Sequence, residues 1–258
     1  MAEGPAIRRS AALRPDDWSI ERFASVDSTN RWLLDAARGG AAPGTVVVAD
    51  HQHAGRGRRG RSWESTPGES LLVSVLLRPL LPVDRAHVVT IAAGLALADA
   101  VERVAGVAAS LKWPNDLVVG ERKLAGLLAE ADVVGGEVRA LVVGAGCNLA
   151  QRSFPPPIAD VATSCVIERG VEPDRDAVLD AFLAAFGDRL DGLDAVVDEY
   201  RRRLGTLGRR VRVELDGSFV EGTATELDDV GRLVVTPLDG VPVVVAAGDV
   251  VHLRAPNR

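Results

Sequence analysis

Apolar runs separated by turn-forming residues divide the first 205 positions of the chain into strands and helices. A short apolar run between Gly, Pro or Asp residues is typical of a buried strand. The strands that we predict are residues 18–26, 45–49, 71–77, 111–119, 123–132 and 138–143. Pro114 interrupts the fourth, because proline cannot donate to a ladder, and Gly135 and Gly136 make the last two a hairpin.

Helical patterns lie between these strands. The first begins after Asp27-Ser28-Thr29-Asn30, a group of residues that favours helix N-termini. The longest is rich in Ala and Leu and has no breaker except Gly94. The helices that we predict are residues 31–38, 84–104, 174–190 and 191–204.

The pattern changes after Gly205, where five short strands are separated by Gly-containing turns. The strands are residues 210–215, 219–227, 232–237, 241–246 and 249–253. This spacing predicts a small β-barrel. We therefore expect an N-terminal arm (1–17), a main domain (18–205) and a small β domain (206–258).

Composition narrows the function classes. The 258 residues are 47% hydrophobic, enough to bury a core, and carry a net charge of −6, which argues against a general nucleic-acid binder. No apolar run is long enough to span a bilayer, and the start of the chain lacks a secretory signal. We expect a cytoplasmic protein whose two cysteines, Cys147 and Cys165, are reduced, partly buried thiols.

Lysine is the rarest positive residue. The chain has 28 arginines and two lysines, and both lysines lie in the stretch from Lys112 to Lys123. A compact ammonium with three rotatable donors does what a planar guanidinium cannot. We interpret the two lysines as chemically required.

A second singular feature is the Gly55-Arg-Gly-Arg-Arg-Gly-Arg61 loop. It matches the dinucleotide fingerprint and the P-loop literally, but no strand directly precedes it, no helix follows, and Arg61 replaces the P-loop lysine. Backbone N–H groups interleaved with guanidiniums suit a small polyphosphate or anhydride-linked anion. An RNA-binding use of the loop stays an alternative.

Four segments in order carry a family resemblance: the Gly/Arg loop, Lys112-Trp-Pro-Asn-Asp116, Lys123-Leu-Ala-Gly126 and Gly144-Ala-Gly-Cys-Asn148. Together they resemble the biotin protein ligases, from about Phe23 to the C-terminus. The resemblance implies an α+β fold: a mixed β-sheet flanked by helices, similar to class II aminoacyl-tRNA synthetase cores, followed by an SH3-like β-barrel.

The implied activity has two steps and uses ATP and Mg²⁺. The biotin carboxylate attacks the α-phosphate of ATP, giving biotinoyl-AMP and pyrophosphate. A lysine of a biotin carboxyl carrier domain of an acyl-CoA or pyruvate carboxylase then takes the acyl group. A lipoate-type ligase is the nearest competing enzyme.

The resemblance also implies roles for individual residues. The expected catalytic residues are Lys123, Arg58, Lys112 and Asp116. The expected biotin-binding residues are Ser28, Thr29, Asn30, Gln52, Gly55, Arg56, Lys123, Gly126, Gly144 and Gly146. Those expected to contact ATP or the adenylate are Arg58, Arg59, Arg61, Trp63, Asn115, Asn148 and Arg254. Asp116 and Asn148 are the expected oxygen ligands of the Mg²⁺ that accompanies the nucleotide.

Simpler roles stay open for several of these residues. Ser28 and Thr29 suit a helix cap, and Asp116 suits a turn after Pro-Asn. Trp63 suits a core, and the glycines suit any close approach of the backbone to a ligand. His51 and His53 flank Gln52 without a third metal ligand nearby in sequence, so we expect wall residues.

Partners follow from the same pattern. Only 27 residues precede Ser28, too few for a separate DNA-binding domain, so we expect no DNA binding. We also expect no membrane partner and a monomer or weak homodimer.

Overall fold

The computed structural model describes residues 18–78 and 82–253. The expected arm at 1–17 and Arg254 lie outside these residues. The large unit is built on a seven-stranded sheet in the order β1-β2-β3-β7-β6-β5-β4. Its strands are β1 (Ser19–Val26), β2 (Thr45–Gln52), β3 (Ser70–Leu77), β4 (Ser110–Lys112), β5 (Asp116–Val119), β6 (Arg122–Val134) and β7 (Glu137–Asn148). Only β1 and β2 pair in parallel among them, so the sheet is mixed as expected.

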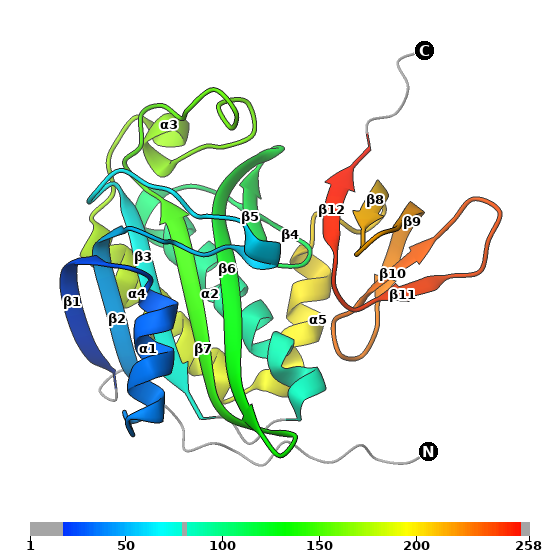
Figure 1. Cartoon of the computed structure of the whole chain (residues 1–258). Helices are drawn as coiled ribbons and strands as arrows, with labels where there is room; N and C mark the ends of the chain where they lie inside the picture. Colours follow the sequence, from blue (N-terminus) through cyan, green and yellow to red (C-terminus); the bar gives the residue numbers. More distant parts are fainter. Residues whose placement is uncertain (1–17, 79–81, 254–258) are drawn as a thin grey trace.

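Helices cover both faces of this sheet (Figure 1). On one face lies α1 (Thr29–Arg38), and on the other lie α2 (Ala86–Ala105), α4 (Arg175–Leu190) and α5 (Leu193–Arg203). Along β2, Val46 and Val48 belong to the core under α2, whereas Val47 packs with Leu33 of α1. Successive side chains of a strand point to opposite faces of the sheet, so the hydrophobic core forms two layers, one on each face.

The long helix α2 is apolar around most of its circumference because it is enclosed by the sheet and by the neighbouring helices α4 and α5. Its contacts are with α4 and α5 on one side and with β4, β6 and β7 on the other. A helix apolar on nearly all sides is expected in such a buried position. A 3₁₀ turn, Val83–Arg85, precedes it, so the helix starts two residues later than predicted.

The small unit is a five-stranded antiparallel sheet in the order β11-β10-β9-β8-β12, as the turn spacing predicted. Its strands are β8 (Arg210–Glu214), β9 (Phe219–Leu227), β10 (Leu233–Thr236), β11 (Val243–Val245) and β12 (Asp249–His252). We call this unit the barrel. Trp113 fastens it to the large unit, since its backbone N–H donates to Thr206 Oγ1 at 3.1 Å and its indole N–H to the carbonyl of Gly231 at 3.2 Å.

Three local features differ from the sequence-based expectations. The segment 111–119 is a β4–β5 hairpin that turns at a cis Trp113-Pro114 bond. A short helix, α3 (Cys165–Arg169), was not predicted. Cys147 and Cys165 are free thiols but fully rather than partly buried, and their mutual hydrogen bond and burial raise the pKa of Cys147. Within the described residues, no helix has both the length and the apolar character needed to cross a membrane.

Candidate active site

A cavity of about 260 Å³ lies where β5, β6 and β7 meet the start of α1, the Gly/Arg loop and the barrel. Most of the sequence-predicted site residues line it. They are Ser28, Thr29, Asn30, Gln52, Arg56, Arg58, Arg61, Trp63, Lys112, Asn115, Asp116, Lys123, Gly126, Gly144 and Gly146. The structure thus brings together residues from segments more than 100 positions apart.

One end of the cavity is a chain of uncharged polar groups. Gln52 Oε1 accepts from the Thr29 backbone N–H at 2.8 Å and contacts Thr29 Oγ1 at 3.0 Å. Because the backbone N–H can only donate, the amide orientation of Gln52 is fixed and its Nε2 remains a donor. Ser28 precedes α1 but makes no capping hydrogen bond, so its hydroxyl is not used by the helix. This end presents donors and hydroxyls in a largely buried setting.

Asn30 links that chain to the sheet and to the Gly/Arg loop. Its Oδ1 accepts from Ser74 Oγ at 2.6 Å, and its Nδ2 donates to Glu130 Oε2 at 2.9 Å. The other oxygen of Glu130 pairs with Arg56 at 2.9 Å. Glu130 was not among the predicted site residues, although its acidic side chain in the otherwise apolar run 124–131 was a usable signal.

The glycines make room for side chains of the protein itself. A Cβ at Gly144 would lie 2.1 Å from Asn30 Oδ1, and one at Gly146 would lie 2.6 Å from the Trp63 ring. A Cβ at Gly126 would lie 3.0 Å from the Lys123 ammonium. The sequence-based reason for these glycines, close approach of a ligand, stays a prediction. In the structure they line the cavity and also leave room for the side chains of Asn30, Trp63 and Lys123.

Since the family resemblance implies biotin and ATP as substrates, we expect Gly144→Ala to raise the KM for biotin by roughly tenfold, because the displaced Asn30 loses a buried hydrogen bond worth about 1–3 kcal/mol. Steady-state kinetics at saturating ATP measures this. Gly192→Ala is the control, since Gly192 has a φ of −125° and nothing lies within 4 Å of the added Cβ there. An unchanged KM in Gly144→Ala would show that Asn30 does not contribute to substrate binding.

The two lysines occupy the charged part of the cavity. Lys123 Nζ lies 2.6 Å from Asp116 Oδ1 and 5.7 Å from the centre of a Trp63 ring. The loop that precedes α3 holds the backbone of Lys123, whose N–H donates to Val161 O at 2.7 Å. Burial lowers the pKa of Lys112, an effect that the nearby Asp116 opposes. An ammonium held in this way gains stability when an anion arrives.

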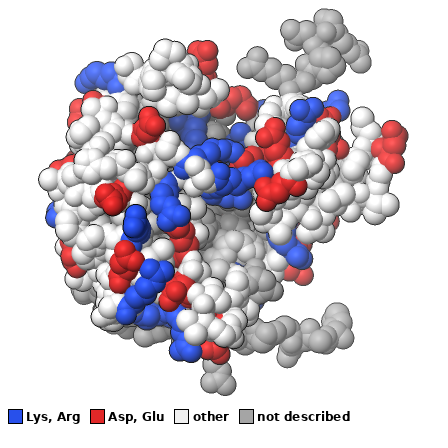
Figure 2. All heavy atoms as spheres, viewed as in Figure 1, with Lys and Arg blue, Asp and Glu red and all other residues white. Residues whose placement is uncertain are grey.

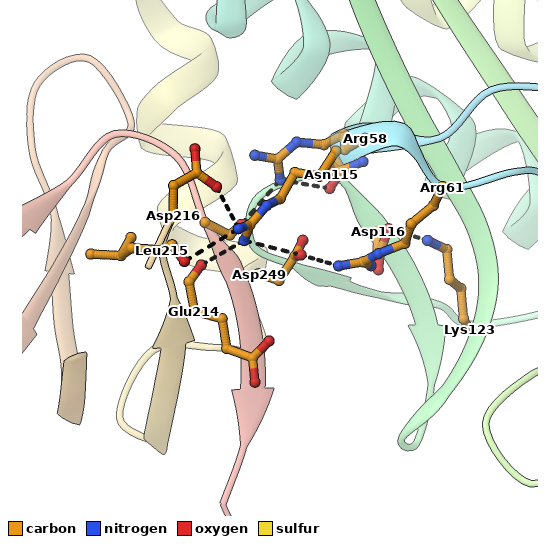
Figure 3. Close-up of polar contacts among 11 residues, drawn as sticks. Arg58, Arg61, Asn115, Asp116, Lys123, Glu214, Leu215, Asp216 and Asp249 are labelled. Carbon is orange, nitrogen blue, oxygen red and sulfur yellow. Dashed lines mark hydrogen bonds and ion pairs between the residues drawn. The ribbon is translucent and has the colours of Figure 1, made fainter. Parts of the chain in front are cut away.

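Arginines of the Gly/Arg loop lie between the cavity and the barrel (Figure 3). Arg58 donates to Asn115 Oδ1 at 3.3 Å and to Gly248 O at 3.2 Å, and burial lowers its pKa. Arg61 pairs with Asp249 of β12. Figure 2 shows Lys and Arg gathered at the centre of this face, with Asp and Glu beside them on the barrel side. The barrel therefore completes one wall of the site.

Arg59 does not line the cavity. It adopts a φ of 54°, which is uncommon for a residue other than glycine. Its guanidinium donates to Glu214 O at 2.9 Å, Leu215 O at 3.2 Å and Asp216 Oδ1 at 2.5 Å. In this structure Arg59 therefore docks the loop on the barrel and does not line the predicted adenylate site.

Other predicted site residues also differ from expectation. Asn148 is buried, donates to Thr163 O at 2.9 Å and does not line the cavity with Asp116. Gly55 lies against the carbonyl of Trp63, outside the lining. The barrel residues Glu214, Asp249, Val250 and Val251 line the cavity but were not predicted, because only the folded chain brings them there.

A resident metal does not fit this site. No group of three His, Cys, Asp or Glu side chains able to hold a metal occurs in the described residues. Asp116 is paired with Lys123, and the expected second ligand, Asn148, does not line the cavity with it. His51 and His53 contact each other edge to face, and His53 bonds to Ser25, in keeping with wall residues.

A buried histidine joins the barrel to the base of the site. His252 Nδ1 lies 2.8 Å from Arg209 Nη1, which can only donate, and 3.2 Å from Glu121 Oε2, while Nε2 lies 3.3 Å from Thr206 Oγ1. The shorter contact with Arg209 favours the neutral ring with its proton on Nε2. Burial lowers the pKa of His252 below its ordinary 6.5, and the charges of Arg209 and Lys112 add to this against the opposing Glu121. The folded chain therefore favours the neutral ring.

Because the unfolded chain protonates His252 more readily, stability from this contact is complete above pH 6.5 and is lost as the pH falls below it. We expect the Tm of the wild type to fall more than that of His252→Gln between pH 7.5 and 5.5, about one unit either side of that ordinary value. Glutamine can still accept from Arg209 and donate to Thr206. Equal decreases in Tm for the wild type and His252→Gln, measured by scanning calorimetry, would rule out this role of His252.

Comparisons with known proteins agree with the geometry. Residues 22–148 match the biotin/lipoate A/B protein ligase family and residues 206–253 match the biotin protein ligase C terminal domain. A biotin--[acetyl-CoA-carboxylase] ligase of Mycobacterium tuberculosis is 39% identical over 246 residues, which cover 91% of this chain and 89% of the relative. The bifunctional ligase/repressor BirA of Bacillus subtilis is 32% identical, over 86% of this chain and 70% of its own length.

A solved structure gives the same result. The biotin protein ligase of Aquifex aeolicus in complex with biotin and ATP superposes with a TM-score of 0.76 at 27% identity, covering 92% of this chain and 99% of its own. The expected fold class is thereby confirmed, with a mixed sheet flanked by helices and an all-β C-terminal unit. On these sequence and structural matches, the chain belongs to the biotin protein ligase family.

Proposed function

We propose that this chain is an ATP-dependent biotin protein ligase, which activates biotin as biotinoyl-5′-AMP and transfers it to a lysine of a biotin carboxyl carrier domain. The observation that carries the proposal is the convergence of Arg58, Lys112 and Lys123 on one cavity whose other end is a chain of neutral hydrogen-bonding groups. We assign residues 18–205 to the catalytic domain, 206–258 to the barrel domain and 1–17 to an N-terminal arm, and place the enzyme in the cytoplasm.

The neutral end suits the ureido ring of biotin. That ring offers one carbonyl acceptor and two N–H donors. Gln52 Nε2 is left as a donor by the contacts of its oxygen with Thr29, and the Ser28 hydroxyl is uncommitted to the helix. A buried site built to match these groups rejects analogues that lack them. This supports biotin over lipoate, whose dithiolane ring has neither group.

The charged end suits the first chemical step. A carboxylate and a phosphate at 4 Å repel each other by about 4 kcal/mol at an effective dielectric of 20. Lys123, Arg58, Lys112 and Arg61 all line the cavity. We assign to Lys123 the role of following the reacting oxygens and to Arg58 and Lys112 that of neutralising the phosphate, with Arg61 at the barrel wall. The biotin carboxylate oxygen forms a bond to the α-phosphorus as the bond to pyrophosphate breaks. Fixed cations that need no reorganisation stabilise the charge of that transition state.

Magnesium enters this scheme with the nucleotide as MgATP. Mg²⁺ is commonly held by the substrate phosphates and water with few protein oxygens, which agrees with the lack of an acidic cluster in the described residues. The bulk of the counter-charge at the acyl-phosphate position then comes from the side chains of the protein.

Biotin-dependent exchange of labelled pyrophosphate into ATP tests the proposal. We expect exchange with biotin and MgATP, followed by labelling of a biotin carboxyl carrier domain of acetyl-CoA carboxylase when one is added. Exchange that requires lipoate instead of biotin would show that lipoate is the substrate. The absence of exchange with either acid would overturn the function.

A further inference from the structure

A second cavity, of about 280 Å³, lies directly against the first. The two share a partition made of Arg58, Pro114 and Asn115, together with Trp113 and the β6 residues Leu127 and Leu128. The outer walls of the second cavity come from the start of α2, the continuation of β6 and two barrel loops. It therefore reaches the reaction cavity from a different side of the molecule.

The walls of this second cavity are suited to hydrocarbon. Ile91, Leu128, Leu141 and the alanines at 86, 129, 131, 246 and 247 make up much of its lining. Its polar side chains are largely engaged within the protein: His87 contacts Val230 O, and the Trp113 indole donates to Gly231 O. The Asn115 amide uses its oxygen on Arg58 and its nitrogen on Leu127 O. Little remains to recognise the polar edge of a nucleotide base.

The partition is thin at one point. Arg58 and Asn115 border both cavities, and the hydrogen bond between them, at 3.3 Å, is long. A group that enters from the second cavity meets the first beside Arg58, where the proposed acyl phosphate forms.

We propose that the second cavity is the access route for the acceptor lysine, so that its four methylenes lie along the apolar walls and its amine reaches the adenylate past Arg58 and Asn115. The inference rests on the ligase function proposed above. Apolar walls and a neighbouring guanidinium both disfavour an ammonium ion, so the lysine arrives as the neutral, nucleophilic amine.

The transfer step balances as follows. The nitrogen lone pair forms the C–N bond to the acyl carbon, and the C–O bond to the phosphate breaks with its electron pair remaining on AMP. The nitrogen releases one proton to solvent. No further reactant is needed, and the products are the biotinylated lysine and AMP.

Two substitutions that narrow this route from opposite walls test the proposal. Ala246 lies in the loop between β11 and β12, and Ala131 lies on β6; both are exposed and line the second cavity but not the first. We expect Ala246→Phe and Ala131→Phe to lower labelling of a biotin carboxyl carrier domain by about a hundredfold, since small displacements of a reacting group have effects of this size. Ala108→Phe is the control, an exposed alanine outside both cavities.

Adenylation is measured separately in the same variants. We expect biotin-dependent pyrophosphate exchange, and hydroxamate formation from added hydroxylamine, to stay within about twofold of wild type, as is usual for surface substitutions. These two readouts also show that the variants fold. Hydroxylamine is small enough to reach the adenylate without a channel fitted to lysine.

Carrier labelling equal to that of Ala108→Phe in both variants would overturn the proposal. A parallel loss of pyrophosphate exchange or of hydroxamate would also overturn it, because the cavity would then serve the nucleotide or the adenylate. A wild-type enzyme that gives no exchange defeats the proposed function instead, and the two failures are therefore distinguishable.

Discussion

Lys123→Arg is expected to lower kcat for biotin-dependent pyrophosphate exchange by about 10²–10³, the loss seen when one preorganised transition-state donor is removed. The ammonium of Lys123 lies 2.6 Å from Asp116 and in contact range of Trp63, with its backbone fixed by Val161. A guanidinium is wider and planar and cannot follow the reacting oxygens from that position. Because the substitution keeps the positive charge, a fall in kcat would result from the different geometry of the guanidinium.

Arg122→Lys is the matched control for this prediction. Arg122 adjoins Lys123 on β6 but pairs with Glu168 at 2.8 Å and does not line the cavity. We expect near-wild-type exchange and an unchanged Tm for it. Turnover close to wild type in Lys123→Arg would show that lysine is not required there, and the scarcity of lysine in the chain would then carry no chemical meaning.

Arg58→Ala is expected to reduce kcat/KM for ATP by about 10²–10³ through the loss of a buried cation at the phosphate position. Its guanidinium borders the cavity and also holds Gly248 of the barrel. Arg59→Ala separates these two roles, because Arg59 does not line the cavity and its guanidinium contacts the barrel, through Glu214, Leu215, Asp216 and Asp249.

For Arg59→Ala we expect less than about a tenfold loss, the scale of one displaced hydrogen-bonding contact. Initial rates over a range of ATP concentrations measure both variants. Equal losses in the two would mean that docking of the loop on the barrel, and not charge at the phosphate, is what the arginines provide.

Much of this site could be predicted from the sequence because its parts are local. The composition of the Gly/Arg loop indicates anion binding, and that of the Lys112 to Lys123 segment indicates a role for its two lysines. Both lysines line the cavity. The strand that ends at Gln52 extends beyond its predicted end at residue 49, and its parallel pairing with β1 places Gln52 opposite Val26, close to Thr29. Hydrophobic patterning located the elements, and pairing fixed the register.

The parts that could not be predicted depend on distant contacts. Asp249 lines the cavity because the barrel docks on the Gly/Arg loop, a contact across 188 positions between Arg61 and Asp249. Asn148 was predicted as an oxygen ligand at the end of a glycine-rich motif, yet its side chain is buried, donates its amide N–H to Thr163 O and does not line the cavity. No local pattern distinguishes an exposed amide from one that a loop covers after folding.

The central claim is that one cavity binds biotin and ATP side by side, with their reacting groups between Arg58 and Lys123. A crystal structure of the enzyme soaked with biotin and MgATP tests it most directly. We predict the ureido ring against Thr29 and Gln52, and the acyl-phosphate linkage within hydrogen-bonding distance of Lys123 Nζ and the Arg58 guanidinium. Biotin or nucleotide bound outside this cavity, or an acyl phosphate that neither residue contacts, would contradict the claim.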